Sequence, residues 1–469
     1  PAGESAETAP LPMADLQKWA ENTTRMQTMW IEFCQNHALE ATSDLMAGDP
    51  AKWFAMFETW AEQLPFANPA EQQRWWAESA QLWQALVLPQ DEEKPDASLP
   101  REDRRFADPR WREQPIFALI HQTYLLLSER VVSMVEQMDH VEPGKREQLK
   151  FATQAMAEAL SPANFAATNP IVLDRIMESR GDSLVKGMQN LLQDLQKGQL
   201  THSDPEAFVV GENIATTPGH VVYETELFQL IQYTPTTDKV LSVPLVIFPP
   251  WINRFYILDL NEKKSFVRWA VDQGLSVFMV SWKSADASLK DVVWDDYIAA
   301  QIEAIDHVRK RLRQPAVHAI GYCVAGTTLA ATLAVLEAKG EADKVKSATF
   351  FTAQVDFDDA GELLHFIDNQ QLAAIKGIER DGFVDGRYMA ATFNLLRGND
   401  LIWNYVVRNY LLGEDHTAFD LLHWNGDVTN LPAKWHRDYL RDLYRDNLLV
   451  KPGRLEALGT PIDLTRVKV

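Results

Sequence analysis

The stretch Gly321-Tyr322-Cys323-Val324-Ala325-Gly326-Thr327 decides how this chain folds. An apolar run over 316–320 leads into it, and small residues over 328–338 lead out of it. A buried strand, a tight turn and a helix in this order are the sequence form of a nucleophile elbow, whose turn carries the attacking side chain. Serine is usual at that position, whereas this chain has Cys323. The alternative interpretation is a buried core cysteine that precedes an ordinary helix.

The position of Cys323 favours a reactive thiol. A cysteine at the N-terminus of a helix feels the positive end of the helix dipole, which stabilises the thiolate. Small neighbouring residues suit a strained turn whose backbone runs close to the adjoining helix. The other cysteine, Cys34, lies on a helical pattern and is interpreted as a packing residue. Because two cysteines make no disulfide framework, we expect a reducing compartment.

Short apolar runs alternate with helical patterns on both sides of the elbow. Strands of a parallel sheet are buried on both faces and therefore appear as continuous apolar runs. The sequence predicts such strands at 245–248, 277–282, 317–320 and 348–352, after a meander of strands at 221–223 and 227–233. Helices are predicted between them at 264–273 and 297–313. We predict an α/β fold of the α/β-hydrolase type, with a parallel sheet covered on both sides.

The helical patterns before and after this region predict a division into domains. We expect a helical N-terminal domain over 1–205, in which 1–12 is a disordered tail and 89–109 a linker. Aromatic residues recur at helical spacing over 13–88, which is more typical of helix packing than of a ligand site. Further helices are predicted at 116–136, 145–160 and 172–196. The α/β core is expected over 206–360, a helical cap above Cys323 over 361–450, and a return to the core sheet over 451–469.

Composition and charge exclude some classes of function. The chain has 469 residues, is 46% hydrophobic and has a net charge of −21. Such an acidic protein does not favour nucleic acid, because nothing offsets repulsion by the phosphates. No apolar run approaches the roughly 20 residues that span a bilayer, and the first residues show no signal-peptide pattern. We therefore expect a soluble, cytoplasmic protein without a transmembrane segment, and we predict no metal ligands.

Further long motifs occur in a fixed order, at Asp103–Pro109, Ser161–Phe165, Thr217–Gly219, Leu230–Tyr233, Pro249–Leu260, Asn399–Tyr405 and Trp424–Asp427. Together with the Cys323 stretch they resemble the polyhydroxyalkanoate (PHA) synthases, the polymerases that make bacterial storage polyester from hydroxyacyl-CoA. The resemblance covers nearly the whole chain from about Asp103. The Gly-Tyr-Cys-Val sequence of the elbow is similar to that of class I, which uses short-chain substrates.

The resemblance implies a specific activity. An acyltransferase of this kind polymerises (R)-3-hydroxyacyl-CoA, such as 3-hydroxybutyryl-CoA, into polyhydroxyalkanoate, and it releases CoA through a covalent cysteine thioester. It needs no cofactor, since the CoA thioester is the substrate. The implied partners are the growing polyester chain, a second copy in a homodimer, and the surface of PHA granules with their associated proteins. The implied location is the cytoplasm, at those granules.

The resemblance and the elbow together point to candidate site residues. Cys323 is the predicted nucleophile, and the backbone N–H of Val324 is one predicted donor to the oxyanion. The second donor is expected from Trp251 or Ile252, in the loop after the first parallel strand, although this loop alternatively serves packing only. The candidates for binding CoA are Arg397, Asn253, Trp424 and Asp259. For Arg397 the alternative is a surface salt bridge.

The chain departs from the family in two places. Ala325 stands where the family usually has a glycine, and Gly326 is expected to keep the turn permissive. The family's catalytic aspartate and histidine follow a segment like Pro461–Leu464, and the printed chain ends at Val469. We therefore expect the printed chain to lack both residues and to be incompetent for polymerisation.

Two alternatives remain open. A weaker hypothesis combines Asp356 as the acid with a cap histidine as the base, and the candidates are His365, His416, His423 and His436; His318 is expected to be packed. The rival functions are an acyl-CoA thioesterase or polyester hydrolase of the same fold, and a catalytically incomplete chain that binds granules.

Overall fold

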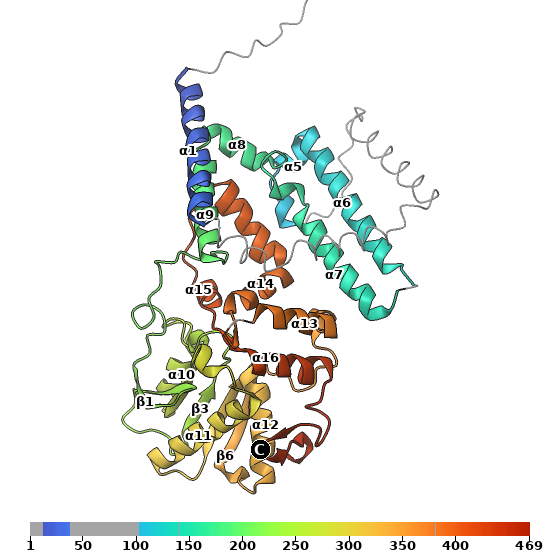
Figure 1. Ribbon diagram of the computed structural model, residues 1–469. Coiled ribbons are helices and arrows are strands. Elements are labelled where there is room, and N and C mark those ends of the chain that lie inside the picture. The colour runs from blue at the N-terminus through green and yellow to red at the C-terminus, as the bar shows by residue number, and fades with distance from the viewer. Residues whose placement is uncertain (1–12, 38–102, 140, 380) are drawn as a thin grey trace, which may run out of the picture. The chain divides into compact units, whose positions relative to one another are not determined.

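The computed structural model describes residues 13–37, 103–139, 141–379 and 381–469 (Figure 1). Two compact units emerge from the contacts between these residues. One contains the described residues up to Leu200 together with Asn394–His416, and the other contains Thr201–Phe393 together with Thr417–Val469. The predictions for the tail 1–12, for the helices over 38–88 and for most of the linker lie outside the described residues.

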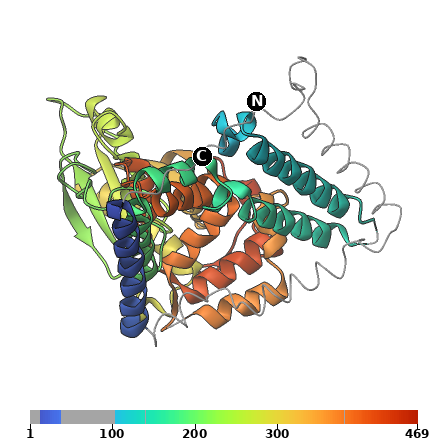
Figure 2. The same cartoon turned by 90° about the horizontal axis from the view of Figure 1, so that it is seen from above.

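The first unit is helical, as the patterns predict. Its longer helices are α1 (Met13–His37), α6 (Pro115–Glu136), α7 (Pro143–Ala159), α8 (Pro170–Glu178) and α9 (Asp182–Lys197), with a short α5 (Arg110–Glu113). Figure 2 shows α6 and α7, in cyan and teal, packed side by side. The end of the predicted linker is folded rather than free, because Phe106 is 3% exposed and its ring stacks on His121 with centroids 4.1 Å apart.

The prediction of a single helical segment over 172–196 is wrong in one respect, because the structure has two helices there. Between α8 and α9 the backbone turns through left-handed conformations at Arg180 (φ 52°) and Gly181 (φ 86°). Glycine adopts this conformation at little cost, so it ends one helix and lets the next begin in a new direction.

The second unit is built on a six-stranded sheet in the order β1-β2-β4-β3-β5-β6. The strands are β1 (Gly219–Glu224), β2 (Phe228–Tyr233), β3 (Leu245–Phe248), β4 (Val277–Trp282), β5 (Val317–Tyr322) and β6 (Val345–Phe351). Strands β3 to β6 pair in parallel, whereas β1 and β2 form an antiparallel meander that joins β4. The predicted strands and the mostly parallel sheet are therefore confirmed.

Helices cover both faces of the central strands, because successive side chains point to opposite faces. Val246 and Phe248 pack against α11 (Trp294–Leu312) and α12 (Val324–Ala338), in a cluster that includes residues of both helices. Leu245 and Ile247 point the other way and pack against α10 (Phe266–Asp272). Each such fully buried aliphatic or aromatic side chain contributes about 1.5–3 kcal/mol of burial free energy.

The edge strand β6 departs from the prediction of burial on both faces. Its side chains are largely exposed, and Phe350 is 44% exposed. Strand order explains the difference, because β6 pairs with β5 on one side and ends the described sheet on the other.

The segment predicted as a cap is helical, with no strand of the six-stranded sheet in its described part. It contains α13 (Asn369–Ile378), α14 (Gly386–Leu396), α15 (Asp420–Gly426) and α16 (Ala433–Tyr439), with π-helical segments at Asn399–Trp403, Val406–Leu411 and Leu440–Arg445. Two short strands, β7 (Phe383–Val384) and β8 (Leu431–Pro432), pair within it. Because residues 394–416 group with the first unit, the segment is divided between the units. The predicted domain boundaries stay predictions.

Residues 451–469 do not return to the central sheet, contrary to expectation. Instead β9 (Glu456–Ala457) and β10 (Thr460–Pro461) form a separate hairpin. Its turn residues, Leu458 and Gly459, have φ of 51° and 70°, the left-handed pair that a tight hairpin turn requires.

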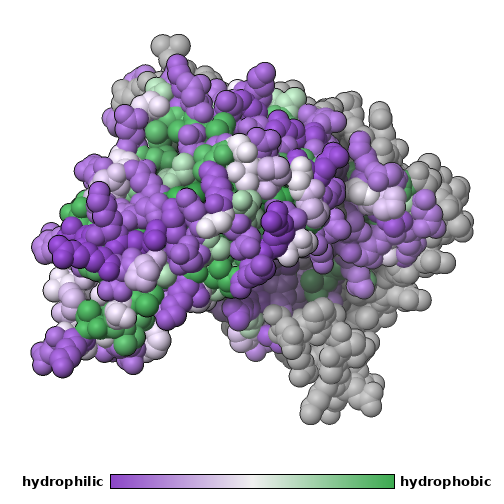
Figure 3. All heavy atoms as spheres, turned by 90° about the horizontal axis from the view of Figure 1, so that it is seen from below, coloured by the Kyte–Doolittle hydropathy of each residue, from purple (hydrophilic) through white to green (hydrophobic). Residues whose placement is uncertain are grey.

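The surface agrees with the acidic, charged composition. On the face drawn in Figure 3, hydrophilic residues make up most of the described surface, and hydrophobic ones form small groups. No helix in the described ranges is long and apolar enough to cross a bilayer.

Candidate active site

The predicted turn is present at Cys323, between β5 and α12. Its backbone has φ 53° and ψ −129°, a conformation that costs a residue with a side chain about 1–3 kcal/mol. Hydrogen bonds hold it in place. The Cys323 N–H donates to the carbonyl of Phe351 (2.9 Å), and the Cys323 carbonyl accepts from the N–H groups of Gly326 (2.8 Å) and Thr327 (3.0 Å). The strained turn thus carries the cysteine at the start of a helix.

Two glycines allow β5 and α12 to approach each other closely. A Cβ on Gly321 would lie 2.5 Å from the Cα of Gly326, and a Cβ on Gly326 would lie 2.5 Å from the Cβ of Ala353. The left-handed conformation belongs to Cys323 and not to Gly326, so the expectation that Gly326 serves the turn is corrected: it provides space. The methyl group of Ala325 fits, because this residue is fully buried in the core beside Val324.

The electrostatic surroundings of Cys323 disfavour the thiolate. The side chain is exposed, yet the protein around it displaces enough water to raise the pKa of the thiol. The N–H of Val324 opposes this effect, since it donates toward the sulfur. Desolvation is the larger of the two effects, so the thiol is mostly protonated at neutral pH and needs a base to attack efficiently.

The loop after β3 lies beside the elbow, because Phe248 pairs with Gly321 in adjacent parallel strands. The side chains of this loop and its backbone make different contacts. The ring of Trp251 is 1% exposed and stacks on Tyr297 at 3.9 Å, so it serves packing. The carbonyls of Trp251 and Ile252 accept hydrogen bonds from Thr429, whereas their N–H groups donate none within the described part of the chain. The role of these N–H groups as oxyanion donors stays a prediction.

Asp259 has a role within the fold. Its carboxylate is 1% exposed and accepts hydrogen bonds from the hydroxyls of Thr217 (2.6 Å) and Ser265 (2.6 Å). Ser265 in turn caps α10. This carboxylate is buried and already bonded, which favours a role in the fold. Binding of CoA by Asp259 stays a prediction.

Asn253 and Trp424 also act within the fold. Asn253 is 9% exposed and pairs with Val428 in an isolated β-bridge. The indole N–H of Trp424 donates to the carbonyl of Arg254 (2.8 Å). Asn253 therefore fastens the loop after β3 to the segment that follows α15, and Trp424 fastens it to α15 itself. Binding of CoA by Asn253 and Trp424 stays a prediction.

Arg397 belongs to the first unit, where it has the contact that the alternative interpretation predicts. Its guanidinium is 69% exposed and pairs with Asp400, three residues further along. An exposed pair of this kind stabilises the fold by less than about 1 kcal/mol. Binding of CoA by Arg397 stays a prediction.

The structure does not favour Asp356 with a cap histidine as the base. The Asp356 carboxylate accepts a hydrogen bond from Asn447 (2.8 Å), which lowers its pKa. His436 is buried, and desolvation lowers its pKa to about 4. His423 packs on a phenylalanine ring, and His318 bonds to Ser347 (2.7 Å). His416 belongs to the first unit. The side chains of His365 and Cys34 lie outside the described residues.

Sequence reasoning missed two tyrosines next to the nucleophile. Tyr439 ends α16 and Tyr444 lies in the π-helical segment that follows, and both interact electrostatically with Cys323. Their rings pack edge-on with centroids 5.5 Å apart, and burial raises the pKa of each phenol. At 3.6 residues per turn, a spacing of five would place them about 140° apart on a helix. The π-helical turn brings the two side chains together, and the sequence pattern does not predict this turn.

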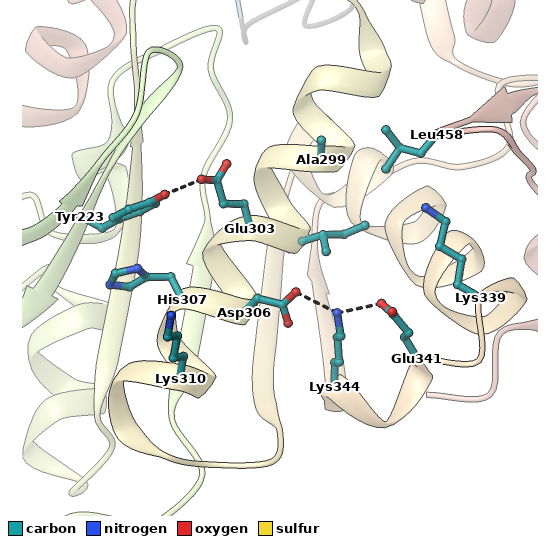
Figure 4. A pocket seen from close by; sticks show the side chains of 11 residues that line it. Tyr223, Ala299, Glu303, Asp306, His307, Lys310, Lys339, Glu341, Lys344 and Leu458 are labelled. Atoms are coloured by element: carbon teal, nitrogen blue, oxygen red, sulfur yellow. Dashed lines mark hydrogen bonds and ion pairs between the residues drawn. The ribbon is translucent and has the colours of Figure 1, made fainter.

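The pocket of about 580 Å³ in Figure 4 lies away from the elbow and contains no elbow residue. Most of its charges compensate one another. Lys344 pairs with Asp306 (2.8 Å) and Glu341 (2.7 Å), while Tyr223 donates to Glu303 (2.5 Å). We therefore place the candidate active site at Cys323.

Known proteins resemble this chain over most of its length. Residues 102–270 match the family described as "Poly-beta-hydroxybutyrate polymerase (PhaC) N-terminus". A "Poly(3-hydroxyalkanoate) polymerase subunit PhaC" from Cupriavidus necator is 42% identical, over 85% of this chain and 68% of that protein. One of the same name from Rhizobium etli is 38% identical, over 100% and 70%. A "Poly(3-hydroxyalkanoate) polymerase" from Methylorubrum extorquens is 43% identical, over 84% and 65%. The chain thus spans about two thirds of the length of these relatives.

Proposed function

Because this chain belongs to the poly(3-hydroxyalkanoate) polymerase (PHA synthase) family, we propose that it transfers acyl groups from (R)-3-hydroxyacyl-CoA to a growing polyester and releases CoA. The observation that carries the proposal is Cys323 itself, a cysteine held in a strained turn at the start of α12. The relatives, which are named as polymerases, support the same conclusion.

We also assign the second unit to the α/β-hydrolase type. Its parallel strands carry the nucleophile turn between β5 and α12, with helices on both faces and a meander at the edge. In that fold the oxyanion is bound by the N–H after the nucleophile and by one from an earlier loop. Val324 and the Trp251–Ile252 loop supply these two positions, and each such donor lowers the barrier by about 3 kcal/mol.

The chemistry begins with loading of the cysteine. The Cys323 sulfur attacks the carbonyl carbon of the acyl-CoA, so that a new C–S bond forms as the bond to the CoA sulfur breaks. The proton removed from Cys323 passes to the departing CoA thiol. One thioester replaces another, so the exchange is nearly balanced in free energy and acyl groups load and leave repeatedly. No cofactor takes part in this scheme.

Chain growth then joins two acyl units. The 3-hydroxyl oxygen of one unit attacks the carbonyl of another thioester, an ester bond forms, and the hydroxyl proton passes through a base to the departing sulfur. Following the family resemblance, we assign the base to a histidine oriented by an aspartate. The raised pKa of the Cys323 thiol makes such a base necessary.

One observation favours a second candidate function. The Cys323 side chain is exposed, so water reaches the position where an acyl-enzyme would form. Hydrolysis there would make the protein an acyl-CoA thioesterase or a polyester hydrolase. Against this, Trp251, Tyr297, Trp435 and Tyr439 form a packed aromatic cluster beside the elbow, with ring centroids 3.9 to 5.7 Å apart. Such a cluster limits the access of water and favours transfer.

Product analysis separates these functions. We would incubate the chain, extended through the aspartate and histidine that the family resemblance implies, with 3-hydroxybutyryl-CoA and measure both CoA release and the acyl product. Insoluble polyester with CoA release supports the polymerase, and free 3-hydroxybutyrate with CoA release supports the hydrolase. If neither product forms, the result supports a chain that only binds granules. Cys34→Ala is the matched control, because it removes the other thiol and leaves the elbow intact.

The wider setting is also part of the proposal. On the family resemblance, we expect short-chain substrates, a homodimer, and a cytoplasmic location at the surface of polyester granules with their associated proteins. Size-exclusion chromatography with light scattering tests the dimer, and a monomer at micromolar concentration would contradict it.

A further inference from the structure

Thr429 holds the loop after β3 by two hydrogen bonds that the mechanism above does not use. Its hydroxyl donates to the carbonyl of Trp251, and its backbone N–H donates to the carbonyl of Ile252 (3.3 Å). Thr429 is only 2% exposed, so little water competes for either bond. A single buried residue thus holds two successive peptide units of this loop.

The residues that precede Thr429 fasten the same loop at neighbouring positions. Val428 pairs with Asn253 in an antiparallel β-bridge. The carboxylate of Asp427 accepts a hydrogen bond from the guanidinium of Arg254 (3.2 Å). Because the loop has these further anchors, loss of the Thr429 hydroxyl changes the orientation of one peptide unit and does not release the loop as a whole.

The hydroxyl of Thr429 sets the direction of one backbone N–H. The carbonyl of Trp251 and the N–H of Ile252 belong to the same peptide unit, which is planar and trans. In such a unit the two groups point in opposite directions, so a carbonyl that is bonded to Thr429 turns the N–H away from Thr429. A hydrogen bond at the carbonyl also polarises the unit and strengthens its N–H as a donor.

The N–H of Trp251, the other predicted oxyanion donor, has no comparable support. It shares its peptide unit with the carbonyl of Pro250, which accepts no hydrogen bond from the described residues. Of the two candidate donors, the N–H of Ile252 is therefore the one whose direction the hydrogen bonds of the loop fix.

The loop that contains this N–H leaves the sheet at the same edge as the nucleophile. Strands β3 and β5 are adjacent and parallel, with Phe248 opposite Gly321, so the loop with Ile252 and the turn with Cys323 both follow the carboxyl ends of neighbouring strands. Ile252 also packs against the apolar cluster that contains Val324, the residue after the nucleophile. The carboxyl edge of a parallel sheet is where such folds place their ligands.

We infer that Thr429 is a positioning residue, which aims the N–H of Ile252 at the carbonyl oxygen of an acyl group that Cys323 attacks. The inference rests on the proposed function and adds the residue that orients the second oxyanion donor. When the sulfur adds to the carbonyl carbon, an electron pair of the C=O bond moves to the oxygen. N–H groups that already point at this oxygen stabilise its charge without reorganisation.

The test compares two reactions of the same thiol in a Cys34→Ser background. With p-nitrophenyl acetate, the Cys323 sulfur adds to the carbonyl carbon, negative charge builds on the carbonyl oxygen, and p-nitrophenolate leaves. With methyl methanethiosulfonate, the sulfur forms a disulfide with the methylthio group, methanesulfinate leaves, and no carbonyl takes part. Both reactions need the thiolate, so the ratio of their rates reports stabilisation of the oxyanion. Mass spectrometry of the Cys323 peptide measures both rates.

Thr429→Val keeps the shape of the side chain and removes its hydroxyl. Acylation should fall by about tenfold, less than the roughly 100-fold that follows outright loss of an oxyanion donor, because the N–H remains but is no longer aimed. The reaction with methyl methanethiosulfonate should be unchanged. Thr429→Ser keeps the hydroxyl and should retain most of the acylation rate. Thr429→Ala should show the same selective loss as the valine variant, and it decides the question if that variant does not fold.

Thr332→Val is the matched control, because it removes another buried threonine hydroxyl in the same unit, one that donates to Gln301 (2.7 Å). It should leave the ratio of the two rates unchanged. An equal loss of both reactions in Thr429→Val, or an unchanged acylation rate, overturns the inference. Failure of the polymerase proposal would appear separately, as the selective loss in Thr429→Val without polyester from 3-hydroxybutyryl-CoA in the chain extended through the implied aspartate and histidine.

Discussion

The close approach of β5 and α12 predicts that Gly326→Ala will damage both the stability and the active site of the chain. The new Cβ would lie 2.5 Å from the Cβ of Ala353 and 2.7 Å from the carbonyl oxygen of Gly321, far inside normal contact distance. The helix must move away from the strand by several tenths of an ångström or more. Overpacking of this kind costs about 1–3 kcal/mol, against which the better helix propensity of alanine returns at most about 1 kcal/mol.

Gly377→Ala is the matched control, because Gly377 lies in α13 and a Cβ there meets nothing within 4 Å. In urea unfolding, Gly326→Ala should be less stable than Gly377→Ala by about 1–3 kcal/mol. In variants of the chain extended through the aspartate and histidine that the family resemblance implies, CoA release from 3-hydroxybutyryl-CoA should fall by about 100-fold in Gly326→Ala alone, since a misplacement of about 1 Å at a reacting group has that cost. Equal stability and equal CoA release in the two variants would refute the argument from close packing.

Two further predictions concern protonation. In a Cys34→Ser background, the rate of Cys323 alkylation by iodoacetamide should rise with pH, with an inflection at a higher pH than for an unperturbed thiol, because desolvation raises the pKa of the Cys323 thiol. Peptide mass spectrometry measures this rate. An inflection at a lower pH than that of an unperturbed thiol would contradict the prediction. His436 is buried and neutral with a pKa lowered to about 4 from 6.5, so the unfolded chain binds this proton first and stability should fall as the pH drops from about 6.5 to 4, by about 3 kcal/mol. Urea unfolding across that range should show the slope in the natural chain and lose it in His436→Phe; an unchanged slope in the variant would show that another group is responsible.

Apolar periodicity was enough to predict most of the central sheet. The strands at 245–248 and 277–282 have the predicted bounds, because fully buried parallel strands give uninterrupted apolar runs. The same reasoning failed at β6, since an apolar run does not tell whether a strand has a neighbour on both sides. It also failed between α8 and α9, where a left-handed arginine and glycine interrupt a pattern that is otherwise continuous.

The candidate site was predictable only where a local motif exists. Cys323 is marked by small residues and by its place between a strand and a helix. Asp259 attracted attention as part of a long motif, yet its carboxylate is buried and bonded to two hydroxyls, a fact that only the fold shows. Tyr439 and Tyr444 were missed because their proximity depends on a π-helical turn, and helical periodicity places residues five apart on different faces.

The central claim is that Cys323 carries the acyl group during the reaction. The most direct measurement is mass spectrometry of peptides from the chain after rapid acid quenching with 3-hydroxybutyryl-CoA, which preserves thioesters. The account predicts a 3-hydroxybutyryl adduct on the peptide that contains Cys323, and neither adduct nor CoA release in Cys323→Ala. Release of CoA by Cys323→Ala at the rate of the natural chain, with no acyl group on the Cys323 peptide, would contradict it.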